Sequence, residues 1–145
     1  MTIDQIKKIL DEFIPFDEDD LENDNESYLY ELTEKLKENN NGKTAIENIF
    51  LLLEKYPNFD FGSPGPLVHT LESFKGDYEN LLIESLNRKP TPMTVWMLNR
   101  IINGTSSAVE RVKYLNIMKD LLKNPMIDSS TNEDIIDFLK YQSAQ

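Results

Sequence analysis

The sequence predicts an all-α protein of about eight short antiparallel helices, arranged as an irregular bundle or as a stack of helical hairpins. Apolar residues recur at helical spacing along almost the whole chain, and helix-capping patterns precede several of these stretches. No stretch alternates apolar and polar residues for long enough to predict a strand. The 145 residues suffice for one domain with its own core, and we expect a single domain over residues 1–145.

Eight apolar stripes mark the expected helices. Within each stripe the apolar residues are three or four positions apart, which places them on one helix face. The links between stripes are short, so successive helices are expected to lie side by side and antiparallel, as in a HEAT-like stack. The longest non-helical segments are expected at residues 16–25 and 58–65. The stripes fall at residues 3–14, 28–36, 45–56, 67–74, 78–86, 95–102, 114–122 and 135–139.

Helix-start and helix-stop patterns agree with these stripes. In a capping box, a hydroxyl accepts a hydrogen bond from an early backbone N–H, and the side chain three residues later reaches back. Proline suits the first helical turn, and glycine or asparagine often follows the last. The expected capping boxes begin at Thr2, Thr44, Ser107 and Ser130, the proline starts are at Pro66 and Pro92, and the stops are at Gly42, Pro57, Gly76, Pro90 and Gly104.

The charge of the chain is strongly negative and unevenly distributed. The net charge is -11, from 26 acidic and 15 basic residues. Residues 1–62 hold 16 acidic and 6 basic residues, whereas residues 63–145 hold 10 and 9. Such a surface repels nucleic acid and anionic lipid and attracts basic proteins. We therefore expect a protein partner, with no nucleic acid and no membrane.

Residues 16–26 form the most distinctive local feature, an acidic loop with seven carboxylates. An EF-hand calcium loop is ruled out, because Leu21 and Glu22 occupy its fifth and sixth positions and the sixth must be glycine. Three interpretations remain: a solvated loop that only adds solubility, a docking surface for a basic partner, or a weak cation site. A docking surface of this charge would speed association with its partner.

The helix expected after the acidic loop continues its negative charge. Glu31, Glu34 and Glu38 share one face, and Glu31 can pair with Lys35 one turn later. Tyrosines on this helix are candidate anchors, because aromatic side chains are enriched at interface cores. The predicted partner-contacting residues are Asp17, Glu18, Asp19, Asp20, Glu22, Asp24, Glu26, Tyr28, Tyr30 and Glu31.

The sequence gives little support for catalysis, a metal or a cofactor. Cysteine is absent and His69 is the only histidine, so thiolate sites and most catalytic zinc sites lack ligands. A Ser-His-Asp system would have to use His69, for which we favour a structural role as a partly buried residue bonded to a neighbour. Residues 63–66 contain two prolines and one glycine, too few free N–H groups for a phosphate loop. We expect no enzyme, no metal and no cofactor.

The expected location is cytoplasmic. The first residues are amphipathic and already include an acidic residue, Asp4, whereas a signal peptide begins with basic residues and an apolar run. No run reaches the roughly 20 apolar residues of a membrane span.

Three segments resemble a known family. They are residues 62–72 (GSPGPLVHTLE), 85–91 (SLNRKPT) and 95–100 (VWMLNR), and the similarity covers residues 59–122. This region resembles the helical immunity proteins of bacterial polymorphic and contact-dependent growth inhibition toxin systems. We interpret the shared residues as a structural signature rather than a partner contact, with Arg88 and Arg100 available to pair with acids such as Glu72 or Glu84. The signature residues are Gly65, Pro66, His69, Glu72, Arg88, Trp96, Asn99 and Arg100.

The resemblance implies a protein that binds a cognate toxin domain and blocks its active site without catalysis. The acidic N-terminal half adds a preference for a basic toxin, such as a nuclease, whose cleft attracts phosphate. The alternative is a HEAT-like adaptor for protein–protein interaction that has no connection with toxins. A helical enzyme that uses His69 is the least favoured class.

Overall fold

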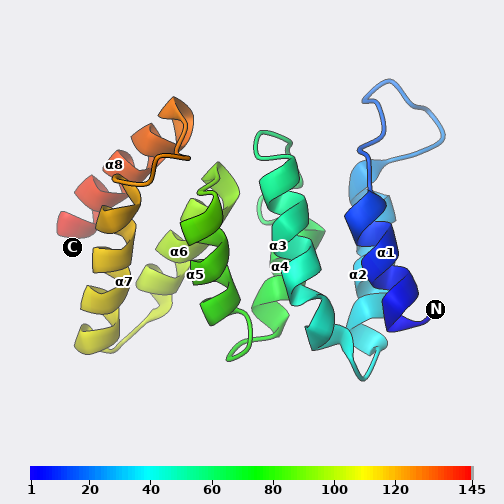
Figure 1. Cartoon of the computed structure of the whole chain (residues 1–145), viewed down its shortest axis with the longest axis horizontal. Helices are drawn as coiled ribbons and strands as arrows, with labels where there is room; N and C mark the ends of the chain where they lie inside the picture. Colours follow the sequence, from blue (N-terminus) through cyan, green and yellow to red (C-terminus); the bar gives the residue numbers. More distant parts are fainter. Residues whose placement is uncertain (145) are drawn as a thin grey trace. The chain divides into compact units, whose positions relative to one another are not determined.

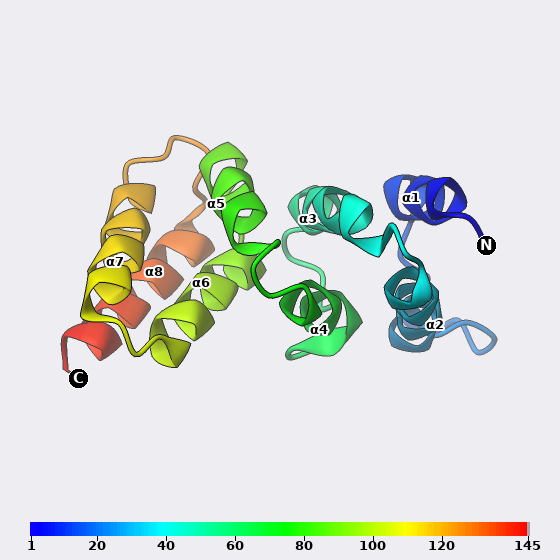
Figure 2. The same ribbon diagram turned by 90° about the horizontal axis from the view of Figure 1, so that it is seen from below.

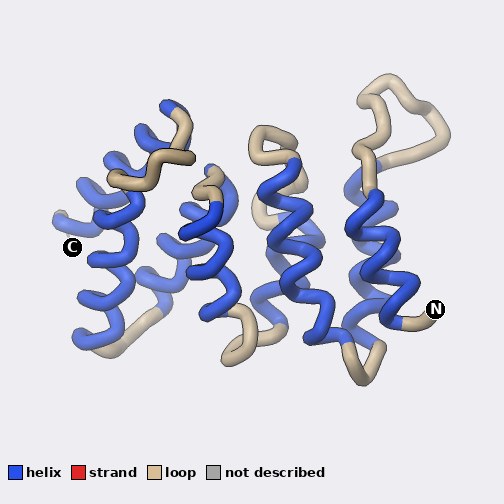
Figure 3. Tube along the Cα trace, in the orientation of Figure 1, coloured by secondary structure: helices blue, strands red, loops and turns tan. Residues whose placement is uncertain are grey.

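The computed structural model describes residues 1–144 and confirms the all-helical prediction: helices and connecting loops make up this part of the chain (Figures 1 and 3). Eight α-helices and one short 3-10 helix follow one another. They are α1 (Ile3–Glu12), α2 (Asn25–Glu38), η1 (Gly42–Ala45), α3 (Ile46–Lys55), α4 (Gly65–Ser73), α5 (Glu79–Arg88), α6 (Pro92–Gly104), α7 (Ala108–Leu121) and α8 (Ser129–Ser143). None of these helices is both long and apolar enough to cross a lipid bilayer.

The chain divides into two compact units, and the boundary falls within α5. Unit 1 comprises Met1–Leu81 and unit 2 comprises Leu82–Gln145. Each unit has its own buried apolar residues. The expectation of a single domain stays a prediction.

Unit 1 consists of two helical hairpins packed in two layers. Helix α1 packs on α3 in one layer, and α2 packs on α4 in the other (Figure 2). The apolar stripes predicted from the sequence meet between the layers, because each helix buries the face that carries them. The most deeply buried side chains include Ile6, Leu10, Leu29, Leu36, Ile49, Phe50, Leu53, Leu67 and Leu71.

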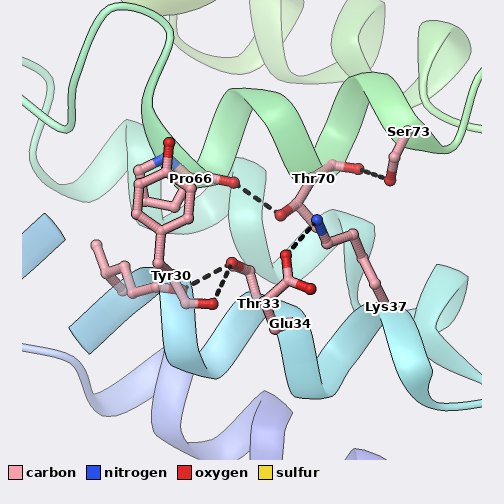
Figure 4. A network of polar contacts seen from close by, with 8 residues as sticks. Tyr30, Thr33, Glu34, Lys37, Pro66, Thr70 and Ser73 are labelled. Atoms are coloured by element: carbon pink, nitrogen blue, oxygen red, sulfur yellow. Dashed lines mark hydrogen bonds and ion pairs between the residues drawn. The ribbon is translucent and has the colours of Figure 1, made fainter. Parts of the chain in front are cut away.

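Two buried threonines lie where α2 and α4 pack together (Figure 4). The Thr33 hydroxyl donates to the Leu29 carbonyl oxygen at 2.8 Å, and the Thr70 hydroxyl donates to the Pro66 carbonyl oxygen at 2.7 Å. Each helix thus satisfies its own buried hydroxyl, which avoids the penalty of an unpaired polar group. The two helices can therefore pack closely through small side chains.

Unit 2 places α6 against both α7 and α8. A partly buried polar network joins these three helices. The Gln142 side-chain amide of α8 donates to Asn99 Oδ1 at 2.8 Å and to Asn103 Oδ1 at 2.7 Å, both on α6. Arg111 of α7 donates to Gln142 Oε1 at 2.7 Å and to the Gln142 carbonyl oxygen at 3.1 Å. Gln142 therefore fixes the position of the last helix against its two neighbours.

Most of the predicted helix starts are confirmed. Thr2 and Gln5 form the complete capping box before α1. Thr91 caps α6 with Pro92 in its first turn, and Ser107 accepts the Glu110 N–H before α7. The corresponding hydrogen bonds satisfy backbone N–H groups that have no partner inside the helix.

Two predicted capping boxes are wrong. Thr44 lies within η1, which leads directly into α3, so no extended cap residue precedes that helix. Ser130 lies inside α8, and the cap is Asp128, whose carboxylate accepts the Thr131 N–H at 2.7 Å. A negative acceptor is favoured there, because the start of a helix carries partial positive charge.

Candidate functional site

The acidic loop and the α3–α4 loop lie at the same end of unit 1 (Figure 1). The antiparallel order of the helices causes this, because the loop that joins α1 to α2 and the loop that joins α3 to α4 both leave their helices at the same end. Between the two loops lies an open depression of about 550 Å³. Six carboxylates of the acidic loop and that of Asp60 line it, and no lysine or arginine does. The lining residues are Asp17, Glu18, Asp20, Leu21, Glu22, Asn23, Asp24, Asn25, Glu26, Asn58, Phe59 and Asp60.

Asn25 closes the acidic loop at its base. The Phe16 N–H donates to Asn25 Oδ1 at 2.7 Å, and Asn25 Nδ2 donates to the Phe16 carbonyl oxygen at 2.9 Å. One amide side chain therefore satisfies both backbone groups of a residue nine positions earlier. The loop ends are held together, as in a compact Ω-loop.

Aromatic packing supports this closure. The Phe16 ring meets the Tyr28 ring edge to face, with centroids 5.4 Å apart. Tyr28 also stacks on Phe13, with centroids 5.8 Å apart, and Phe13 itself is buried. Aromatic pairs of this kind contribute roughly 0.5–1.5 kcal/mol beyond their buried area. Phe16 is thus fixed from α1 and from α2, and the loop begins at a defined place.

Two of the seven carboxylates also order the loop itself. The Asn23 side-chain amide donates to Asp20 at 3.1 Å and the Glu22 N–H donates to it at 2.9 Å; these bonds hold the pKa of Asp20 below its ordinary value. Asp24 is the N-cap of α2 and accepts hydrogen bonds from the Ser27 hydroxyl and the Ser27 N–H. Both bonds lower the pKa of Asp24, and the bond from the hydroxyl has the larger effect. Both carboxylates therefore stay ionised into mildly acidic solution.

The other loop carboxylates point to solvent. Within residues 1–144, none of the seven forms an ion pair, and no three acidic or histidine side chains converge as metal ligands would. Unit 1 as a whole has 19 acidic and seven basic residues, a net charge of -12, whereas unit 2 has seven and eight, a net charge of +1. The arrangement can attract and orient a cationic surface.

The structure brings together six of the ten residues predicted to contact a partner. Asp17, Glu18, Asp20, Glu22, Asp24 and Glu26 line the depression. Asp19 is an exposed loop residue outside its lining, and Glu31 is exposed on α2. In α2 the ion pair links Lys37 to Glu34, with Lys37 Nζ 2.6 Å from Glu34 Oε1, and not Glu31 to Lys35 as the spacing suggested (Figure 4).

The two tyrosines predicted as anchors lie outside the depression. Tyr28 belongs to the aromatic cluster below the loop. Tyr30 lies on α2, the helix that packs on α4. Each tyrosine is 37% exposed, so each packs within unit 1 and keeps an accessible edge.

Sequence reasoning missed several residues of the depression. Asn58, Phe59 and Asp60 come from the α3–α4 loop, and Leu21 is fully exposed (100%) among the acids. The expected antiparallel order of the helices could have pointed to Asp60, because it places both loops at one end. The closing role of Asn25 has no local sequence pattern, since its partner lies nine residues away.

The residues of the proposed structural signature fall in both units. Gly65 and Pro66 are buried at the start of α4, and Gly65 has a positive φ of 79°, which favours glycine. The side chain of His69 is exposed, so the prediction of a partly buried histidine is wrong: it lies on the solvent face of α4, whose buried residues flank it. Within residues 1–144 it has no hydrogen-bond partner, and no Ser-His-Asp relay is assembled around it.

The remaining signature residues are structural to different degrees. Glu72 is half-buried and Arg88 is exposed. Trp96 is half-buried, and the Arg100 guanidinium lies over its ring at 4.8 Å from the centroid. Asn99 is buried and accepts the hydrogen bond from Gln142.

Comparison of the chain with protein-family models, with curated proteins and with solved structures found no match. The resemblance to helical immunity proteins therefore stays a prediction.

Proposed function

We propose that this protein binds a basic partner protein through the acidic depression of unit 1 and performs no catalysis itself. The specific form of the proposal is an immunity protein that occludes a cognate bacterial toxin domain, with a basic nuclease as the preferred toxin. One observation supports it above all: six carboxylates of a closed loop and Asp60 of the neighbouring loop line one concave surface, with no basic side chain among them.

The charge of this surface suits a nuclease cleft. Nucleases bind a chain of phosphates, and their clefts carry lysine and arginine side chains for that purpose. A row of carboxylates offers the same cations a comparable partner. The field would also speed the encounter of the two proteins, which favours an inhibitor that must act before the toxin does damage.

The order of the loop supports docking over mere solubility. A loop whose only role is solvation needs no fixed conformation, whereas this one is closed by Asn25 and braced by Phe16 and Tyr28. Fixing the loop before binding reduces the entropy lost on association. Leu21 at its tip adds an exposed apolar side chain that a partner could cover.

The test uses two variants with the same change in net charge. The loop variant is Asp17→Asn, Glu18→Gln, Glu22→Gln and Asp60→Asn, which spares Asp20 and Asp24 because they order the loop. The control variant is Glu84→Gln, Glu110→Gln, Asp120→Asn and Asp137→Asn, all exposed residues of unit 2.

A cognate toxin is first sought in the gene next to this one. Each variant is then co-expressed with the toxin domain, and binding is measured at low and moderate salt. We expect the loop variant to bind about 10- to 100-fold more weakly, to lose protection, and to show a smaller salt dependence. The control should protect like the natural sequence. Equal protection by the two variants would place the docking surface elsewhere.

A HEAT-like adaptor is the second candidate function. The packing of unit 1 favours it, because two layers of antiparallel hairpins are the arrangement of helical repeat scaffolds. An adaptor predicts several partners and no toxin gene next to this one. The identity of the neighbouring gene therefore separates the two functions.

A further inference from the structure

Unit 2 carries a second concave surface, between α7 and α8. It is an open groove of about 340 Å³. Leu115 of α7 and Ile136 and Leu139 of α8 form its apolar floor, and Gln142 and Ser143 close one side. We call this surface the α7–α8 groove.

The groove exists because α7 and α8 carry apolar residues on more than one face. On α7, Tyr114, Met118 and Leu121 are buried in the core, while Leu115 faces the groove and Val112 lies one turn earlier with 57% of its surface exposed. On α8, Ile135 is fully buried, and its neighbour Ile136 is 37% exposed. Exposed apolar surface of this kind is what partner-binding sites on soluble proteins present.

The charge of the groove is opposite to that of the whole chain. Lys119 of α7 and Lys140 of α8 line it, and none of its lining residues is acidic. Each helix thus supplies one ammonium group beside the apolar floor. In a chain with a net charge of -11, a groove whose only charged groups are cationic selects for an acidic occupant.

We propose that the α7–α8 groove binds a helical segment of a partner protein whose apolar side chains are flanked by carboxylates. The lining suits a helix, because the residues that each helix supplies to it follow one another at helical spacing: Leu115 and Lys119 along α7, and Ile136, Leu139 and Ser143 along α8. A helix in such a groove presents its own apolar stripe, spaced three and four residues apart, to the floor. Its carboxylates then reach the two lysines.

This site is separate from the acidic depression and selects the opposite charge. A partner on unit 1 must be basic, whereas the occupant of the groove must be acidic. A second copy of this chain is disfavoured as the occupant, because two molecules of net charge -11 repel each other. The two surfaces together would allow this protein to hold two different partners.

The experiment uses the full-length protein and two labelled helical peptides as probes. Both peptides carry leucines at helical spacing; one has glutamates on the flanks and the other has lysines in their place. Binding is followed by fluorescence anisotropy at low salt. The protein variants are Ile136→Gln, which makes the floor polar, and Lys119→Gln with Lys140→Gln. The matched control is Lys113→Gln with Lys123→Gln, exposed lysines outside the groove lining.

The acidic depression of unit 1 can attract the basic peptide, so the groove is tested by the effect of its own substitutions on each peptide. Ile136→Gln and the Lys119/Lys140 pair should each weaken binding of the acidic peptide at least fivefold, the control pair should weaken it less than twofold, and Ile136→Gln should leave binding of the basic peptide unchanged. Equal effects of Ile136→Gln on the two peptides, or equal effects of the two lysine pairs on the acidic peptide, would overturn the proposal. A second result would also overturn it: the protein forms a concentration-dependent dimer, Ile136→Gln abolishes that dimer, and the acidic peptide does not bind. The occupant of the groove would then be a second copy of the chain.

Discussion

Units 1 and 2 are built from the same kind of helix but differ in charge. Unit 1 has a net charge of -12 and concentrates its acids in one loop, whereas unit 2 has a net charge of +1. Helix formation does not require this difference, because both units bury apolar stripes of similar character. Charge and fold are thus set by different residues of the same helices and loops.

The units also place their most extensive polar networks differently. In unit 1, the side chain of Asn25 orders a surface loop by bonding to the Phe16 backbone. In unit 2, Gln142 is 3% exposed and orders the core by bonding to two other helices. The first network shapes a surface that a partner can reach, and the second fixes how helices pack. Substitutions at Gln142 and Asn25, each with a control, test this distinction, and substitutions at Asp128 test a third polar contact.

The largest effect is expected in unit 2, from Gln142→Ala. The change leaves the buried Asn99 and the exposed Asn103 without their donor, and the half-buried Arg111 without its acceptor side chain. Buried polar groups left unpaired cost about 1–3 kcal/mol, so we expect the free energy of unfolding to fall by about 2–3 kcal/mol. Urea unfolding of the full chain measures it.

The neighbouring Ser143→Ala serves as a control for Gln142→Ala. Ser143 is exposed and its hydroxyl bonds only to carbonyl oxygens of its own helix, so its loss should change stability by less than about 0.5 kcal/mol. If both substitutions have the same small effect, the buried amide does not hold α8 in place.

A smaller and more local effect is expected in unit 1, from Asn25→Ala. Two partly buried hydrogen bonds to Phe16 are lost, which should lower stability by about 1–2 kcal/mol. Hydrogen exchange of the Phe16 amide should also accelerate, because its acceptor is removed. Asn23→Ala, which removes an exposed bond to Asp20, should leave the Phe16 exchange rate unchanged. An unchanged rate in both variants would show that the aromatic packing alone closes the loop.

The smallest effect is expected from Asp128, the N-cap of α8, and concerns how the stability that this cap contributes depends on pH. The Thr131 N–H lowers the pKa of Asp128 in the folded state. A lowered pKa adds stability at neutral pH that disappears as the pH falls below about 4, through the folded-state pKa. Asp128→Ala should lose about 1 kcal/mol at pH 7, whereas Asp128→Asn should keep the cap and lose only the acid dependence. Unfolding midpoints of the natural sequence and of both variants between pH 7 and pH 3 check this. If the curve of the natural sequence stays parallel to the curves of the two variants as the pH falls, the lowered pKa contributes no stability.

Much of the fold could be predicted from the sequence because the evidence for it is local. Apolar spacing within ten residues predicts a helix face, and Thr2, Pro92 and Ser107 mark three starts correctly. The prediction at Thr44 failed because a 3-10 turn runs directly into α3, and the prediction at Ser130 failed because Asp128, two residues earlier, caps α8. The difference in charge between the two units is visible in the sequence, but their boundary at Leu81–Leu82 lies within a helix and has no local sequence pattern.

The candidate site was predicted only in part, for a physical reason. A run of acids is visible in the sequence, so the loop carboxylates could be named. Asp60 is 34 residues beyond Glu26 and joins them only after two hairpins have packed. The α7–α8 groove was missed as well, because Ile136 and Leu139 look like core residues until the position of α7 is known.

The closure of the acidic loop separates the residues that hold it from the residues it displays. Phe16 and Asn25 hold its base, Asp20 and Asp24 order the chain between them, and the other acidic residues of the loop contribute charge and surface alone. Substitutions of those other acidic residues can therefore alter which molecule is recognised without disturbing the helices on either side. Such a segment works as an exchangeable cassette, through which related chains could diverge in specificity while their architecture stays the same.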